Sequence, residues 1–188
     1  MSDYLIRLDL QRCIHCKACV IHCKSSKSVP QGIKLGLLVT VRPTQMTQMI
    51  KSHKILSAFS HCFHCEKPWC VAVCPTGAMI RREKDGIVTI KKELCVGCKS
   101  CIVVCPWNVP QWDETSGKIL KCDYCLDRIE AGLKPACVSA CATHALSFGK
   151  ANEDTIRVRA SFGKSLRNNK DWEVTPQDSK SEIIGRKQ

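Results

Sequence analysis

Residues 13–24 read CIHCKACVIHCK, with cysteines at 13, 16, 19 and 23 and a histidine beside two of them. Core packing does not require four thiols so close together, so this stretch indicates metal ligands. The same kind of group occurs three more times, and each of the sixteen cysteines falls into one of the four groups. The fourth cysteine of a group always stands four residues after the third. The chain therefore contains a degenerate internal repeat whose unit is a cysteine quartet.

The four groups differ only in the gap before their third cysteine. CVGCKSCIVVCP (95–106) keeps the spacing of the first group, CFHCEKPWCVAVCP (62–75) has four residues in that gap, and CDYCLDRIEAGLKPACVSAC (122–141) has eleven. Three thiolates spaced C-x2-C-x2-C wrap a tight loop around one face of an iron–sulfur cubane. The fourth cysteine of such a run ligates the neighbouring cluster in two-cluster ferredoxins. The pattern predicts four [4Fe–4S] clusters, with all sixteen cysteines as iron ligands.

Other cofactors fit these groups poorly. Structural zinc uses two C-x2-C pairs, which leaves the third cysteine and the C-x3-C-P ending unexplained. A c-type haem needs C-x-x-C-H, and Lys17, Glu66, Lys99 and Leu126 occupy the histidine position. Rieske ligation replaces two cysteines by histidines, whereas every quartet here is complete. We therefore interpret the nearby histidines as loop residues or hydrogen-bond donors to sulfur. They are His15, His22, His61 and His64.

The charge of the chain changes its meaning once the thiols bind metal. The net charge of +12 counts cysteines as neutral, and four oxidised clusters would lower it to about +4. With only 5% aromatic residues, no base-stacking surface is indicated, so we expect no nucleic-acid partner. No export signal is recognisable at the start, and the longest apolar run, residues 33–41, is too short to span a membrane. We expect a cytoplasmic protein with reduced thiols and no membrane span.

Short strands and helices are expected between the groups, giving an α+β fold class. Apolar alternation predicts three strands, at 4–10, 35–41 and 144–148. A hairpin is predicted over 78–90 with its turn at Asp85-Gly86, and a glycine turn within 114–121. Cysteines four residues apart span one helical turn, so short helices are expected at 101–105 and 136–141. Pro75 and Pro106 are expected to end two of the helices.

The four groups, with the expanded second one and the long gap inside KCDYCLDRIEAGLKPACVSAC (121–141), resemble the four-cluster ferredoxin-type subunits of multisubunit redox enzymes. The best-known members are the electron-transfer subunits of the DMSO reductase family. Related subunits serve formate dehydrogenases, hydrogenases and CO dehydrogenase, and tungsten enzymes of the aldehyde oxidoreductase family, including class II benzoyl-CoA reductase. The resemblance covers about residues 4–150.

This resemblance implies that each cluster takes three cysteines from one group and its fourth from another. The implied ligands are Cys13, Cys16, Cys19 and Cys141 for cluster 1; Cys122, Cys125, Cys137 and Cys23 for cluster 2; Cys62, Cys65, Cys70 and Cys105 for cluster 3; and Cys95, Cys98, Cys101 and Cys74 for cluster 4. It also implies two bacterial-ferredoxin-like double-cluster modules. The inner module (55–112) would be inserted in the outer one (1–30 and 113–150), with a connecting segment at 31–54. Residues 151–188 contain no cysteine and many charged and polar residues, so we expect an extended C-terminal arm laid over the domain or a partner, with a disordered end as the alternative.

Two positions depart from the family pattern. Lys24 and Ala142 stand where proline would follow the fourth cysteine, and we expect softer helix ends there without loss of a cluster. Several lysines in or beside the loops are expected to favour the reduced clusters through their charge. They are Lys17, Lys24, Lys67, Lys99 and Lys121.

The sequence indicates electron transfer rather than catalysis. It has no P-loop, no dinucleotide-binding glycine motif after a strand and no nucleophile elbow, and every cysteine is committed to a quartet. We expect a non-catalytic subunit that moves single electrons between a large catalytic subunit of tungsten or molybdenum type and a second electron carrier. The alternatives are a subunit of a hydrogenase or CO dehydrogenase complex, a free-standing polyferredoxin shuttle, or clusters with a purely structural role. Iron-free protein is expected to be largely unfolded.

Overall fold

The computed structural model of the chain describes residues 3–41, 56–153, 155–156 and 159–160. Residues Met1–Ala151 form one compact unit and Asn152–Gln188 a second. The described part of the first unit contains short helices and four two-stranded antiparallel sheets. Helix and strand are therefore mixed, as the α+β prediction requires. Most of the arm predicted at 151–188 lies outside the described residues.

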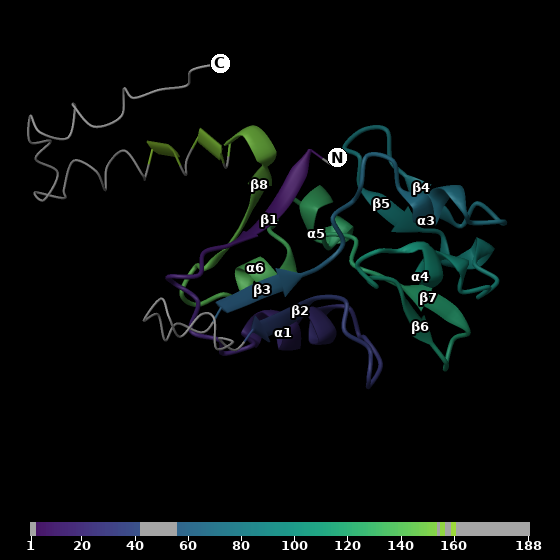
Figure 1. Cartoon of the computed structure of the whole chain (residues 1–188), viewed down its shortest axis with the longest axis horizontal. Coiled ribbons are helices and arrows are strands. Elements are labelled where there is room, and N and C mark those ends of the chain that lie inside the picture. Colours follow the sequence, from purple (N-terminus) through teal and green to yellow (C-terminus); the bar gives the residue numbers. More distant parts are fainter. Residues whose placement is uncertain (1–2, 42–55, 154, 157–158, 161–188) are drawn as a thin grey trace, which may run out of the picture. The chain divides into compact units, whose positions relative to one another are not determined.

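The two ends of the cysteine-containing region lie side by side (Figure 1). Strand β1 (Tyr4–Leu8) pairs with β8 (Leu146–Lys150), with Ile6 opposite Phe148. This confirms the strands predicted at 4–10 and 144–148, the second displaced by two residues. Helix α1 (Ala18–Ser26) packs against α6 (Ala136–Ser139), the helix predicted at 136–141. Their shared core consists of Cys19, Val20, Leu38, Cys137, Val138 and Leu146.

A second sheet adds a strand that the sequence did not reveal. Strand β2 (Leu37–Val41), predicted at 35–41, pairs with β3 (Leu56–Ser60). The β3 sequence LSAFS has no clear apolar alternation, and its Ser57 is buried. The segment that joins these strands, within the predicted connecting segment at 31–54 and the start of the inner module, lies outside the described residues.

A second group of elements gathers around its own core (Figure 1). It contains the helices α3 (Trp69–Ala72), η1 (Lys92–Leu94) and α4 (Ser100–Val104), the hairpin β4 (Met79–Arg81)–β5 (Val88–Ile90) and the hairpin β6 (Gln111–Asp113)–β7 (Lys118–Leu120). Both predicted turns are confirmed, with left-handed Gly86 and Gly117 in them. Ile119 of β7 packs with Met79 and Cys101. Helix α5 (Leu126–Glu130), which was not predicted, occupies the long gap of the fourth group.

The expected softer helix end at Lys24 is not found. Helix α1 continues past Cys23 to Ser26, and the Lys24 ammonium donates to the carbonyls of Pro30 and Ile33, both at 2.9 Å. Proline at this position would have removed the backbone N–H and disfavoured the helical conformation of Cys23, and lysine does neither. At Ala142 the helix is not extended in this way: α6 ends at Ser139, before Cys141.

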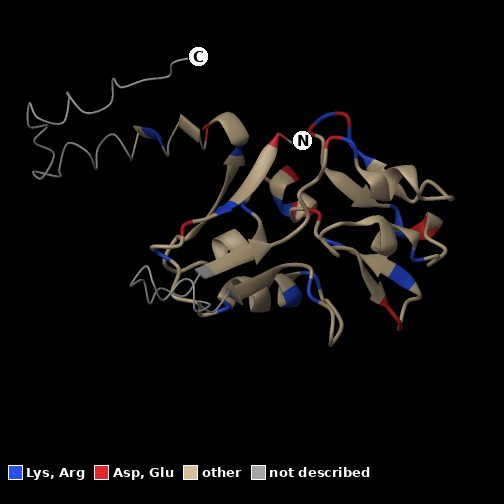
Figure 2. Ribbon diagram, viewed as in Figure 1, with Lys and Arg blue, Asp and Glu red and all other residues tan. Residues whose placement is uncertain are grey.

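The structure also shows where the charged residues lie and how apolar the helices are. Among the described residues, lysines and arginines lie on loops, helices and strands of both groups of elements (Figure 2). No helix in the described part of the chain combines the length and the apolar character needed to cross a membrane.

Candidate iron–sulfur cluster sites

Each cysteine group has a left-handed residue immediately before its second cysteine. These residues are His15 (φ 58°), His64 (46°), Gly97 (70°) and Tyr124 (57°). Non-glycine residues rarely adopt this conformation, so its recurrence marks a loop shape that the repeat imposes. The shape turns backbone amides toward sulfur, as where the His64 N–H donates to Cys62 Sγ at 3.5 Å. Only Gly97 signalled this conformation in the sequence.

Helices begin directly after these loops. Lys17 and Lys99 follow the second cysteine of the first and third groups, both in the left-handed region, and they are the N-caps of α1 and α4. Cys125 has the same role and conformation before α5. The loop thus ends by setting the direction of a helix. That helix contains Cys19 and Cys23 in the first group and Cys101 in the third.

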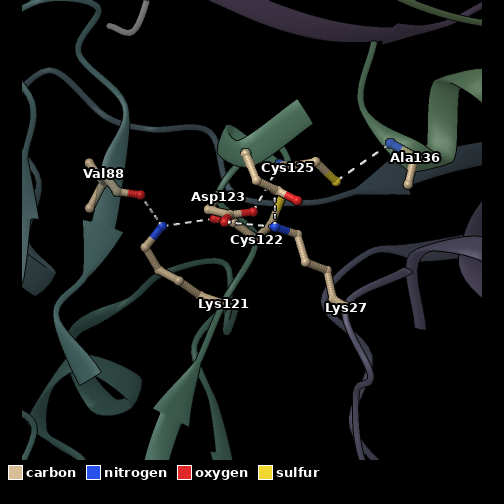
Figure 3. Close-up of polar contacts among 8 residues, drawn as sticks. Lys27, Val88, Lys121, Cys122, Asp123, Cys125 and Ala136 are labelled. Carbon is tan, nitrogen blue, oxygen red and sulfur yellow. Dashed lines mark hydrogen bonds and ion pairs between the residues drawn. The ribbon is translucent and has the colours of Figure 1, made fainter. Parts of the chain in front are cut away.

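The sixteen thiols are free of disulfides and differ in exposure. The exposed ones are Cys16, Cys65 and Cys98, each the second cysteine of its group. The corresponding cysteine of the fourth group, Cys125, is buried and accepts a hydrogen bond from the Ala136 N–H at 3.5 Å (Figure 3). The fourth group is therefore the most enclosed of the four.

In the half of the first unit built on α1 and α6, neighbouring thiols come from the first and fourth groups. Burial raises the pKa of Cys19, and the adjacent Cys141 thiol adds to the effect. Burial raises the pKa of Cys23 to about 11, with a contribution from Cys125. The pKa of Cys137 is also raised by burial. Its next largest influences are Cys122, Cys125 and Cys23.

In the other half, neighbouring thiols come from the second and third groups. Burial raises the pKa of Cys65 and of Cys70, and Cys62 and Cys105 raise both further. One pocket brings together four sulfurs from two groups. They are Cys74, Cys95, Cys98 and Cys101. Most of the remaining lining is apolar and includes Ala78, Met79, Ile90 and Ile119, while Thr76 and Lys99 are its polar members.

These surroundings fit iron–sulfur clusters. A buried thiol with a raised pKa stays protonated at neutral pH unless a metal replaces the proton, and iron bound to thiolate supplies that replacement. Amides directed at sulfur and an apolar lining are the features by which proteins stabilise such clusters. Among the described residues, no three His, Cys, Asp or Glu side chains are arranged for a single metal ion. The cysteines of a cubane each bind a different iron and are spaced more widely.

The histidines near the cysteines have partners of other kinds. The His15 ring contacts the Ser57 hydroxyl at 2.7 Å, and the His61 ring contacts the carbonyl of Cys62 at 2.9 Å. The His64 ring is fully buried and accepts the Val88 N–H at 2.8 Å. Burial lowers the pKa of His64 to about 2, so the ring is neutral. His22 is exposed on α1.

Of the five lysines expected to favour the reduced clusters, three are exposed: Lys17, Lys67 and Lys99. Lys24 is committed to carbonyls of the following loop. Lys121 is buried and its ammonium lies beside Cys62 Sγ, at 3.7 Å. Of these five lysines, Lys121 alone is buried and contacts a cysteine sulfur.

A further charged contact was not anticipated from the sequence. Lys27, at the end of α1, forms an ion pair with Asp123 at 3.1 Å (Figure 3). It forms a second one with Asp127 at 2.5 Å. Burial acts to lower the pKa of Lys27, but the hydrogen bond to Asp127 and the charge of Asp123 raise it above its ordinary value. The pair ties α1 to the fourth group. Its only sequence signal is that Lys27 stands one helical turn beyond Cys23.

Comparisons with known proteins agree with this geometry. Two family models described as 4Fe-4S dicluster domain match the sequence, over residues 53–151 and 12–78. The electron transfer subunit of thiosulfate reductase from Salmonella typhi is 39% identical over 157 residues, which is 83% of this chain and 80% of the relative. The B subunit of anaerobic dimethyl sulfoxide reductase is 36% identical in Haemophilus influenzae, over 87% of this chain and 80% of the relative. The Escherichia coli K12 protein of the same name is also 36% identical, over 81% and 76%.

The predicted cofactor and resemblance are thereby confirmed. Two dicluster domains and sixteen cysteines correspond to four [4Fe–4S] clusters, each of which supplies a one-electron couple when bound. The chain therefore belongs to the 4Fe-4S dicluster family, among the iron–sulfur electron-transfer subunits of the dimethyl sulfoxide and thiosulfate reductase type.

Proposed function

We propose that this chain carries single electrons within an oxidoreductase complex, between a large catalytic subunit of tungsten or molybdenum type and a second electron carrier. The observation that carries the proposal is the cysteine geometry, in which thiols of different groups share pockets and enclosed surroundings. The relatives support it, because their names describe an electron transfer subunit or the B subunit of a reductase.

The ligand sets follow the resemblance. Cluster 1 is held by Cys13, Cys16, Cys19 and Cys141, cluster 2 by Cys122, Cys125, Cys137 and Cys23, cluster 3 by Cys62, Cys65, Cys70 and Cys105, and cluster 4 by Cys95, Cys98, Cys101 and Cys74. Support comes from the four thiols of the last set, which line one pocket. The influences of Cys141 on Cys19, of Cys23 on Cys137 and of Cys105 on Cys70 support the exchange of fourth ligands in the other sets.

Electrostatic influences between thiols support an order in which the sets follow one another from cluster 1 to cluster 4. Cys137 of the second set is influenced by Cys19 of the first, and Cys122 of the second set by Cys62 of the third. Cys101 of the fourth set is in turn influenced by Cys70 of the third. An electron passing from one end of this row to the other crosses every set. Exposed cysteines lie in the first, third and fourth sets, at Cys16, Cys65 and Cys98, so partner proteins have access to both ends of the row and to one set inside it.

We propose that the inner module is inserted in the outer one, with clusters 1 and 2 in the outer module and clusters 3 and 4 in the inner one. The outer module comprises 1–30 and 113–150, the inner module 55–112, with 31–54 connecting them and 151–188 as an arm against the complex. Pairing of β1 with β8 and packing of α1 on α6 support the closure of the outer module from two distant segments. The proposed boundary between the inner and outer modules, after residue 112, falls within the β6–β7 hairpin. Trp112 and Ile119, from its two strands, both pack in the core of the second group of elements.

Anaerobic purification from the native host tests the proposal. We expect the chain to co-elute with a large subunit containing tungsten or molybdenum, and to hold about sixteen irons that reduce with dithionite. Co-elution with a hydrogenase or CO dehydrogenase subunit would replace the catalytic partner. A stable monomer would instead indicate a free shuttle, and clusters that resist reduction would indicate a structural role.

Paired cysteine variants test the ligand sets. Cys105→Ser alone is expected to remove about four irons, and Cys62→Ser combined with it is expected to remove no more, because both serve cluster 3. Cys95→Ser combined with Cys105→Ser is expected to remove about eight, although these two cysteines share a sequence group. The reverse result would contradict the exchange of fourth ligands.

A further inference from the structure

Lys121 is a buried cation between the two halves of the first unit. It is 6% exposed and directly precedes Cys122. Its ammonium donates to the carbonyl of Val88 in β5 and to the carbonyl of Cys122, the latter at 2.8 Å (Figure 3). It also donates to Cys62 Sγ at 3.7 Å. An ammonium group has three N–H donors, so these contacts use all of them.

The charge of Lys121 has no carboxylate partner among the described residues. The nearest acidic residue in the sequence, Asp123, accepts instead from Lys27 at 3.1 Å and from the Cys125 N–H at 2.9 Å. Burying an unpaired cation is unfavourable unless an anionic group compensates it. Cysteine sulfurs on both sides of Lys121 provide such anions once iron is bound, because Cys62 Sγ lies 3.7 Å from the ammonium and Cys122 adjoins it in the chain.

The surroundings hold Lys121 in this position. The Val88 carbonyl accepts from Lys121, while the Val88 N–H donates to the His64 ring. The His64 ring in turn lies against the ring of Tyr124, with 3.9 Å between centroids. Residues of the second and fourth cysteine groups are thus packed together around one positive charge. This contact lies where the proposed sets of cluster 2 and cluster 3 adjoin.

We propose that Lys121 is a positioning residue for electron transfer between the modules, whose fixed positive charge raises the reduction potentials of clusters 2 and 3 together. The proposal rests on the ligand sets proposed above. Adding one electron adds one negative charge to a site without a proton, and a desolvated cation beside the site stabilises that charge. Hydrogen bonds to sulfur and nearby charge are the means by which proteins set these potentials. Both sites at the junction are thereby made more favourable for an electron than they would be without this charge.

Redox titration followed by EPR, on the complex as purified anaerobically, tests this role. In Lys121→Met two of the four midpoint potentials are expected to fall, while the other two stay unchanged. Lys121→Arg keeps the charge and is expected to retain the wild-type potentials. Lys67→Met is the matched control, because Lys67 stands between Cys65 and Cys70 of the same proposed cluster but is exposed. Water and salt screen its charge, so no potential is expected to move.

Each outcome decides the inference. Unchanged potentials in Lys121→Met, or equal shifts of all four, would overturn it. If methionine prevents cluster loading, Lys121→Gln supplies a second neutral variant that retains amide donors. Failure of both neutral variants to load iron, with Arg loading normally, would make Lys121 a structural residue and would also overturn the inference. Iron content of the wild-type complex separates the two proposals, because fewer than about sixteen irons would count against the clusters themselves.

Discussion

Two cysteine groups with identical spacing, residues 13–23 and 95–105, are followed by very different backbone. In both, a left-handed lysine begins a helix, Lys17 before α1 and Lys99 before α4. Helix α1 has nine residues and continues beyond its fourth cysteine, whereas α4 has five and ends before it. Cys23 is consequently helical, while Cys105 is extended, with φ −79° and ψ 114°.

The residue after the fourth cysteine explains the difference. Pro106 excludes the helical conformation at Cys105 and has no N–H to continue the ladder, whereas Lys24 has neither restriction. The longer α1 then brings Lys24 to the carbonyls of the next loop and Lys27 to the fourth group. Cysteine spacing therefore sets the loop, and the following residue sets what the group contacts beyond it.

Removal of iron is expected to unfold both helices, α1 and α4, and so to abolish the difference in length between them. Cysteines are members of all three hydrophobic cores, for example Cys19, Cys101 and Cys23. Helices of nine and five residues are too short to persist without these cores. Far-ultraviolet circular dichroism after anaerobic chelation is expected to lose most of its helical signal. Retention of near-native helix content would show that the cores do not depend on the clusters.

Alanine at the left-handed loop position is expected to affect the third group far more than the first. A Cβ at Gly97 would lie 2.6 Å from the Trp112 ring and 2.7 Å from the Gly117 carbonyl oxygen, at φ +70°. Overpacking and left-handed strain together predict a loss of about 2 to 4 kcal/mol for Gly97→Ala. His15→Ala loses only the hydrogen bond to Ser57, about 1 kcal/mol. Anaerobic urea unfolding, followed by cluster absorbance, measures both, and equal losses would contradict the comparison.

Local patterns predicted most of the fold, and tertiary placement was beyond them. Cysteine spacing, the Asp85-Gly86 turn and apolar alternation identified the groups, both turns and three strands, because each depends on a few neighbouring residues. Strand β3 was missed because its buried Ser57 conceals the alternation. Nothing local distinguishes Lys121 from the four other lysines near the loops, since its burial depends on Val88 and Cys62, more than thirty residues away.

Loss of the Lys24 ammonium is expected to weaken the first group alone. Lys24→Met removes two hydrogen bonds to partly buried carbonyls, at Pro30 and Ile33, and leaves both acceptors unpaired by the side chain. The expected loss is about 1 to 2 kcal/mol of unfolding free energy. His22→Ala, exposed on the same helix, is the control and is expected to be nearly neutral. A loss as large in the control would indicate that α1 is sensitive to substitution in general, and would count against the two contacts.

The smallest expected effect is a difference in stability between substitutions of Lys17 and of Lys99, the two left-handed lysines at the starts of α1 and α4. The Lys99 ammonium lies over the Trp112 ring, 4.2 Å from its centroid, whereas Lys17 has no ring contact in the described part of the chain. Lys99→Met removes a cation–π interaction worth about 0.5 kcal/mol at an exposed site, and Lys17→Met removes none. Both substitutions leave the left-handed backbone strain unchanged, so the difference between them isolates the ring contact. Parallel urea titrations of the two variants measure this difference. An identical midpoint for both would show that the ring contact contributes nothing to the stability of the third group.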